Sequence, residues 1–157
     1  MLLFGHIGIG AFVASMLFLP ILFGVAGALL PDVIDKGLFV LGLAPCGRFV
    51  AHSLFFPPVA GILTYLVTRN KKIAIAIALG AALHLLQDMH DNVPFLAPIK
   101  TYEFYGTCGQ IKILFTPYII ATELIGGVLL IFTLGFRKKL AEFRKDVWNL
   151  IYRILRR

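Results

Sequence analysis

Histidine and aspartate side chains recur at helical spacing near the end of one apolar stretch. In the segment HLLQDMHD, His84, Asp88 and Asp91 stand at positions i, i+4 and i+7. If this segment is helical, the spacing places all three side chains on one face. Imidazole nitrogen and carboxylate oxygen both bind transition metals, so His84 and Asp88 resemble a helix-borne ligand pair. His90 falls on another face, and we expect it in a loop.

Two more acids and a second histidine lie beside other apolar segments. Asp32 and Asp35 follow Pro31 in LLPDVID, where a helical turn would point both carboxylates to one side. An N-cap beside a solvated loop acid explains this pair equally well. Arg48 and His52 are four residues apart and would share a helix face. The alternative for them is an arginine reaching the lipid headgroups beside a core histidine.

Mixed imidazole and carboxylate ligands predict a site for one or two divalent metal ions, Zn, Mn or Fe. Ionisable groups near hydrocarbon are costly unless they are paired, neutralised or bound to a cation, and a metal ion would remove that cost. A divalent ion also lowers the pKa of a coordinated water and supplies a nucleophile. A metal-bound nucleophile would make the protein a metal-dependent hydrolase. In that enzyme we expect Asp35 to act as a base and Arg48 to hold an anionic oxygen.

The composition indicates that these residues belong to an integral membrane protein. Of the 157 residues, 59% are hydrophobic and only 15% are charged, and the mean hydropathy is +0.89. Soluble domains are about half apolar and a quarter charged. The net charge of +7 does not indicate nucleic-acid binding, because the basic residues flank apolar segments. We expect one transmembrane helical domain at residues 1–136, carrying the metal site, and a tail at residues 137–157.

The first apolar segment, residues 2–31, carries no formal charge and is interrupted by Pro20. It therefore forms either one long kinked span or two half-helices. The fold class predicted from the whole pattern is all-α, a polytopic transmembrane bundle with a kinked or re-entrant N-terminal segment.

Further spans are expected at residues 49–68, 73–87 and 113–136. Pro57 and Pro58 should kink the first of these. The segment at residues 73–87 is short, and it reaches membrane thickness only if its helix continues to about residue 91.

The distribution of lysine and arginine predicts the orientation. Eleven of the fifteen basic residues lie between the second and third expected spans or after the last one. Positively charged flanks are retained in the cytoplasm, so that side is cytoplasmic and the loops carrying Asp32, Asp35 and residues 89–112 face outward. The predicted location is the plasma or inner membrane, multi-pass, with a cytoplasmic C-terminal tail.

The tail places apolar residues at spacings of three and four, with charges largely elsewhere. It predicts a C-terminal amphipathic interfacial helix whose partners are membrane lipids, with Trp148 and Tyr152 at headgroup level. A protein-binding motif is the alternative.

At the motifs GHIG, LLPDVID, RFVAHS, GAALHLLQD and FLAP, the chain resembles the YdjM-like family of predicted membrane-bound metal-dependent hydrolases. The resemblance covers about residues 3–98. Two positions depart from the family pattern: Lys36 stands where a histidine is usual, and Ala51 replaces a threonine. The resemblance implies functional roles for the matching residues. It marks as functional His6, Asp32, Asp35, Arg48, His52, His84 and Asp88. From the chemistry of the side chains we expect as metal ligands His6, Asp32, Asp35, His52, His84 and Asp88, and as catalytic residues Asp35 and Arg48.

His6 makes a geometric demand on the first segment. In one continuous span, His6 and Asp32 would lie at opposite membrane faces. If Pro20 breaks the segment into a re-entrant pair, the two residues meet on the outer side, and we favour this arrangement.

The sequence supports a metal-dependent hydrolase acting at the outer membrane face on a lipid-linked or phosphoester substrate. The alternative is a proton- or metal-handling transport protein with a relay through Glu123 and Asp88. For Glu123 we favour a protonated carboxyl group hydrogen-bonded to a neighbouring helix. The sequence lacks HExxH, GxSxG and GxxxxGK[ST] motifs. Cys46 and Cys108 are both predicted outside, where a disulfide is plausible.

Overall fold

The computed structural model describes residues 3–103 and 116–155, and every regular element in these residues is helical. The elements are, in chain order, α1 (Leu3–Met16), α2 (Ile21–Val40), the short 3-10 helix η1 (Val50–His52), α3 (Phe56–Thr68), α4 (Lys71–Gln87), α5 (Pro117–Gly135) and α6 (Arg137–Leu155). The predicted all-α class is confirmed.

The first apolar segment forms a helical hairpin of two half-helices and not one kinked span. Helix α1 ends at Met16, and α2 begins after Pro20, whose fixed φ suits the residue that precedes a helix. Helix α2 does not end with the apolar run. It continues through Asp32 and Asp35 to Val40, so the expectation that these acids lie in an outer loop was wrong. Helix α2 packs against α4 and η1. These tertiary contacts are available to a helix that continues beyond its apolar stretch.

The expected span at residues 49–68 is interrupted. Helix α3 starts only at Phe56, and Pro57 and Pro58 occupy its first turn. The missing proline N–H groups cost nothing there, because first-turn N–H groups have no intrahelical acceptor. The predicted proline kink was therefore wrong. So was the shared helix face for Arg48 and His52, because Arg48 precedes η1.

Helix α4 begins at Lys71 and is capped by Asn70, whose side chain accepts from the N–H groups of Lys72 and Ile73. It ends at Gln87 with Asp88 as C-cap, so the helix does not continue to residue 91, the condition set for this segment to reach membrane thickness.

The turn after α4 carries His90, as expected. Its ring lies against that of Tyr118 in α5, with ring centroids 4.2 Å apart. Cys46 is disulfide-bonded, and Cys108 lies outside the described residues.

Helices α5 and α6 match the last expected span and the tail, although residues 113–115 and 156–157 lie outside the described part. Among the described residues, α5 is the one helix both long and apolar enough to cross a membrane, whereas α1 and α3 are apolar but shorter. Large apolar side chains stand exposed along α5, including Leu124, Val128 and Ile131. A polytopic arrangement remains a prediction.

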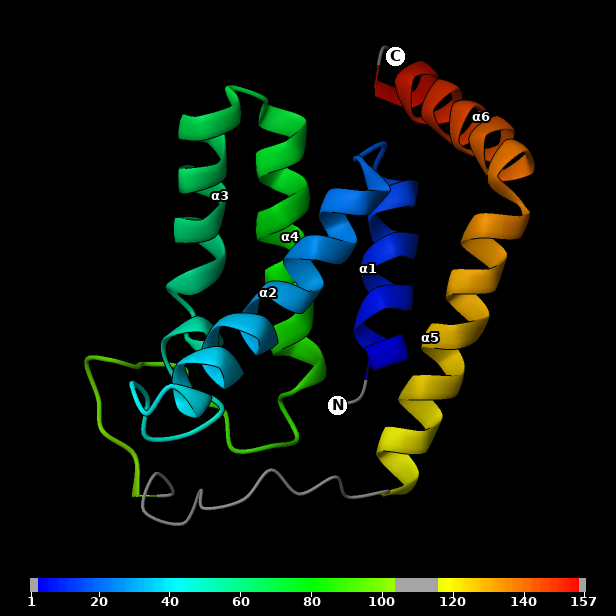
Figure 1. The fold of residues 1–157 in the computed structure, drawn as a ribbon. Helices are drawn as coiled ribbons and strands as arrows, with labels where there is room; N and C mark the ends of the chain where they lie inside the picture. The colour runs from blue at the N-terminus through cyan, green and yellow to red at the C-terminus, as the bar shows by residue number, and fades with distance from the viewer. Residues whose placement is uncertain (1–2, 104–115, 156–157) are drawn as a thin grey trace.

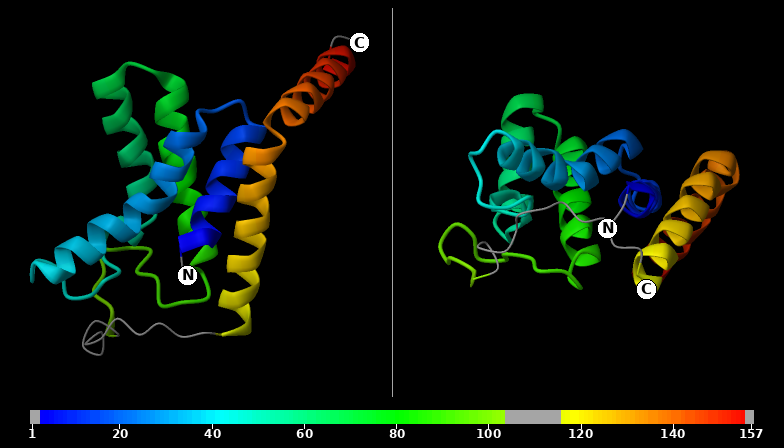
Figure 2. Two further views of the ribbon diagram at one scale, coloured as in Figure 1. Left: turned by 45° about the vertical axis from the view of Figure 1, so that its right-hand side comes forward. Right: turned by 60° about the horizontal axis from the view of Figure 1, so that its bottom comes forward.

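Helix α1 lies between α5 on one side and α2 and α4 on the other, and α2 runs obliquely across α1 and α4 (Figures 1 and 2). The N-terminus of α1, the C-terminus of α4 and the second half of α2 lie at one end of the molecule. The α3–α4 turn and α6 lie at the opposite end (Figure 1). The hairpin thus returns α2 to the end at which α1 begins.

Glycines allow these helices to approach one another closely. A Cβ atom on Gly8 would collide with the backbone of Gly126 in α5, and one on Gly27 would collide with the backbone of Ile77 in α4. Gly80 similarly faces the backbone of Gly24. Small residues at crossings are typical of membrane helices, which gain stability from close packing where lipid removes the hydrophobic drive.

Candidate metal centre

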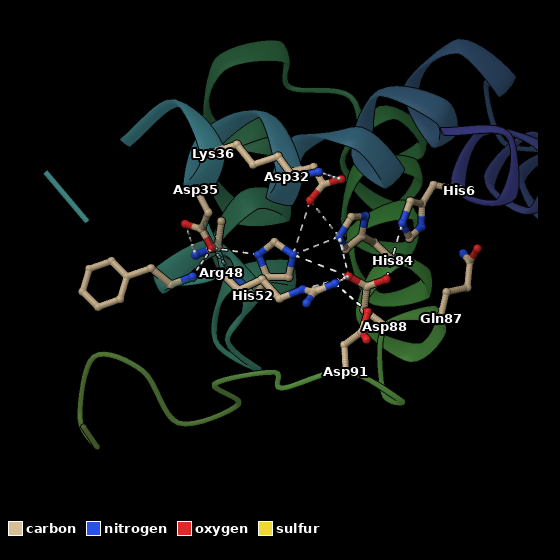
Figure 3. Close-up of polar contacts among 12 residues, drawn as sticks. His6, Asp32, Asp35, Lys36, Arg48, His52, His84, Gln87, Asp88 and Asp91 are labelled. Carbon is tan, nitrogen blue, oxygen red and sulfur yellow. Dashed lines mark hydrogen bonds and ion pairs between the residues drawn. The ribbon is translucent and has the colours of Figure 1, made fainter. Parts of the chain in front are cut away.

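A cluster of histidine and aspartate side chains is buried between α1, α2, η1 and α4. We call the set of His6, Asp32, Asp35, His52, His84 and Asp88 the His/Asp cluster (Figure 3). Five of its members are at most 1% exposed, and Asp32, at 20%, is the most accessible. Polar groups this deeply buried require partners, and their arrangement shows what those partners can be.

His52 and His84 face each other through the same ring atom. Their Nε2 atoms are 3.1 Å apart, while His52 Nδ1 lies 2.8 Å from Asp35 Oδ2 and His84 Nδ1 lies 2.7 Å from the carbonyl oxygen of Ala28. Because both Nδ1 atoms face acceptors, each carries the proton of a neutral ring, and both Nε2 lone pairs point into the gap. Two lone pairs aimed at each other are explained by a cation between them.

Asp88 and Asp32 complete the surroundings of this gap. Asp88 Oδ2 lies 3.8 Å from both Nε2 atoms, and Asp32 Oδ1 lies 3.6 Å from His52 Nε2 and 3.9 Å from His84 Nε2. Two nitrogen or oxygen ligands of a tetrahedral zinc ion stand about 3.4 Å apart, given bonds of about 2.1 Å. The observed distances lie close to that value.

His6 lies on the far side of His84. The two rings are stacked, with centroids 4.0 Å apart and planes 18° apart, and His6 Nε2 is 3.6 Å from Asp88 Oδ1. Neither ring nitrogen of His6 has a hydrogen-bond partner in the described part of the chain. Such a buried imidazole is explained if it binds something that the protein itself does not supply.

The potential ligand atoms form two overlapping groups, each within 4.8 Å: His52, His84 and Asp88, and His6, Asp32 and His84. Both use His84, whose Nδ1 is engaged by Ala28. Neutral imidazole and carboxylate are suitable donors for Zn, Mn or Fe, so the residues fit a divalent ion. The chemistry of the donors does not select among these metals.

Asp35 is placed behind His52. Its carboxylate accepts hydrogen bonds from the backbone N–H groups of Phe49 (2.6 Å), Ala51 (3.0 Å) and His52 (3.1 Å), besides facing His52 Nδ1. The His52 ring therefore stands between Asp35 and the other cluster members (Figure 3). Asp35 belongs to neither ligand group, and its position is that of a residue orienting a metal-binding histidine.

Two cations border the cluster. Arg48 binds Asp88 Oδ2 through Nε (3.2 Å) and Nη2 (3.0 Å), and its Nη2 also lies 2.7 Å from Asp91 Oδ2. Lys36 Nζ lies 2.7 Å from Asp32 Oδ2, which leaves Oδ1 of Asp32 facing the two histidines. Lys36 is 44% exposed and Arg48 is 28% exposed, so both cations reach the surface beside the buried cluster.

The structure thus brings together all six predicted ligands, with Arg48 beside them. The sequence did not predict the part played by Ala28, because its contact with His84 is made by a backbone carbonyl that every residue carries. The bond between Lys36 and Asp32 was also missed, although their spacing of four residues within a helix would have indicated it.

The fold and the cluster define a class: an all-helical protein with a buried group of histidines and carboxylates able to hold a metal ion. The sequence profile of the YdjM inner membrane protein family matches residues 1–151. The chain therefore belongs to this family of inner membrane proteins, and the match includes α5 and most of α6, beyond the expected residues 3–98. No curated protein and no solved structure shows significant similarity to the chain.

Proposed function

We propose that this protein is an integral membrane metal-dependent hydrolase that acts at the outer membrane face on a lipid-linked or phosphoester substrate. The observation that carries the proposal is the pair of Nε2 atoms of His52 and His84, held 3.1 Å apart with both Nδ1 atoms facing acceptors. This geometry orients two lone pairs towards one point.

The ligand groups favour a single divalent ion. Among the described residues, Lys36 and Arg48 contact aspartates of the site, and a bound cation would compensate the negative charge of these aspartates further. The two ligand groups also share His84, which has one nitrogen free to bind, so they cannot be filled by separate ions.

A divalent ion held by His52, His84, Asp88 and Asp32, with His6 beside them, would lower the pKa of a coordinated water and supply a nucleophile. The protein's own contribution is orientation. Asp35 fixes the ring of His52, so we assign it a positioning role in place of the catalytic role expected from the sequence.

The partly exposed cations Lys36 and Arg48 beside the cluster favour an anionic substrate. The planar guanidinium of Arg48 suits phosphate oxygens, and Lys36 adds a second positive charge. These two residues support a phosphate-bearing group at the point of reaction.

The position of the basic residues supports a location of the His/Asp cluster at the outer membrane face. Arg69, Lys71 and Lys72 lie at the α3–α4 turn, and α6 lies at that same end, opposite the cluster (Figure 1). Because basic flanks are retained in the cytoplasm, the cluster faces outward and α6 is cytoplasmic. Helix α5 is long enough to span, and it packs against α1 of the first hairpin.

Metal-loaded protein in detergent should hydrolyse members of a phosphoesterase and lipase substrate panel, and chelation should abolish the activity. Asp88→Ala should be inactive, whereas Asp146→Ala in α6 should retain activity. An inactive metal-loaded wild type on phosphoester and lipid-phosphate substrates would contradict the proposal, and metal or proton flux into proteoliposomes would favour the transport alternative.

The contacts of Glu123 speak against the relay on which that alternative rests. Both carboxyl oxygens of Glu123 accept hydrogen bonds from backbone N–H groups of α1, so the expected bond to a neighbouring helix is present. These bonds account for the carboxylate without a transport role.

A further inference from the structure

We propose that Glu123 of α5 is a positioning residue for the metal centre, because it holds the first turn of α1 and thereby the ring of His6. The inference rests on the proposed metal centre. It assigns a role to α5, which supplies no member of the His/Asp cluster.

Glu123 binds α1 where that helix has free donors. Its Oε2 accepts from the N–H of Phe4 at 2.8 Å, and its Oε1 accepts from the N–H of Gly5 at 3.0 Å. First-turn N–H groups lack intrahelical acceptors, and the helix dipole favours negative charge beside them. Glu123 therefore acts as a capping residue supplied by another helix, 118 residues away from Gly5 along the chain.

A close backbone contact accompanies this cap. Gly126 lies three residues after Glu123, and a Cβ atom there would collide with the backbone of Phe4 and Gly5. Gly8, in turn, has no room for a Cβ atom because of the Gly126 backbone. Cap and close contact together set the position of α1 along α5.

His6 follows Gly5 directly and depends on this position. The ring is 1% exposed, and neither nitrogen has a hydrogen-bond partner among the described residues. Stacking on His84 keeps the His6 ring nearly parallel to the His84 ring, but it does not stop the His6 ring from sliding within its own plane. The backbone of the first turn therefore sets the distance of 3.6 Å from His6 Nε2 to Asp88 Oδ1.

Cobalt binding to the full-length protein in detergent tests this role, with affinity measured by chelator competition and ligand geometry by visible absorption. Glu123→Ala should weaken Co²⁺ binding roughly 10-fold or more, the size of effect seen when a ligand loses its supporting contact, and should shift the absorption bands. Glu123→Gln keeps the side-chain shape and one acceptor, so its affinity should lie in between. Glu142→Ala, a matched change at an exposed site of α6, should leave both readouts unchanged.

The double variant with His6→Ala separates positioning from general stability. If Glu123 acts through His6, Glu123→Ala should cause no further loss of affinity once His6 is absent. An undiminished effect in the His6→Ala background, or wild-type affinity and spectrum in both Glu123 variants, would overturn this inference alone. Failure of the wild type to bind Co²⁺ would overturn the proposed metal centre as well.

Discussion

At the scale of single residues, the site depends on which ring nitrogen of each histidine is engaged. Asp35 and the Ala28 carbonyl each face an Nδ1 atom, and this contact directs the opposite Nε2 atom into the gap. Hydrogen bonding by the distal ring nitrogen fixes the tautomer and orientation of a ligand histidine. The binding capacity of the cluster is therefore built by residues that need not touch the ion.

Asp35→Asn should test this indirect role. The amide cannot accept at both of its terminal atoms, so it loses part of the hydrogen bonding to His52 Nδ1 and to three backbone N–H groups. Metal affinity should fall roughly 10- to 100-fold in chelator competition. Asp146→Asn, at an exposed position of α6, is the matched control. Unchanged affinity in Asp35→Asn would show that His52 needs no such support.

Lys36→Gln should affect the substrate more than the metal. Lys36 bonds the Asp32 oxygen that faces away from the histidines, and it is partly exposed. Metal content should stay near that of the wild type, whereas KM for a phosphate-bearing substrate should rise severalfold with a smaller change in kcat. A variant with lost metal and unchanged KM would place Lys36 in metal binding instead.

At the scale of elements, the sequence predicted the identity of the helices better than their ends. The break at Pro20 and the amphipathic tail follow from local chemistry, and the re-entrant arrangement followed from the demand that His6 meet Asp32. The ends of α2 and α4 depend on tertiary contacts, which hydropathy does not report. Local spacing thus predicted His84 and Asp88 as partners. It could not show that Asp35 faces Nδ1 of His52, away from the gap between the two Nε2 atoms.

Neighbouring glycines of α5 offer a matched test of helix packing. Gly126→Val places a side chain against the backbone of α1. A Cβ atom at Gly127, in contrast, would have no neighbouring atom within 4 Å. Overpacking typically costs about 1–3 kcal/mol, so Gly126→Val should unfold at a clearly lower temperature in detergent. Gly127→Val should stay close to the wild type. Equal stability of the two variants would contradict the close crossing of α1 and α5.

At the scale of the whole molecule, the polar centre lies at the end opposite the basic residues of the α3–α4 turn and α6 (Figure 1). The cluster lies where α1 begins and α4 ends, while α6 extends from the far end of α5 (Figure 2). In the orientation that we propose, the centre lies at the outward end and the basic helix lies at the inner end, beside anionic lipid.

Reporter fusions at the C-terminus test the orientation in living cells. If the tail is cytoplasmic, as we propose, a green fluorescent protein fused there should fluoresce, and an alkaline phosphatase fused at the same position should be inactive. Active alkaline phosphatase with no fluorescence would reverse the orientation and place the cluster on the cytoplasmic side.

The most direct test of the central claim is the metal content of the full-length protein after mild detergent purification. We predict about one divalent ion per chain in the wild type, and little or none in His52→Ala and His84→Ala variants that remain folded. A wild type well below one equivalent after incubation with Zn²⁺, Mn²⁺ or Fe²⁺, or full occupancy in both variants, would contradict the metal centre.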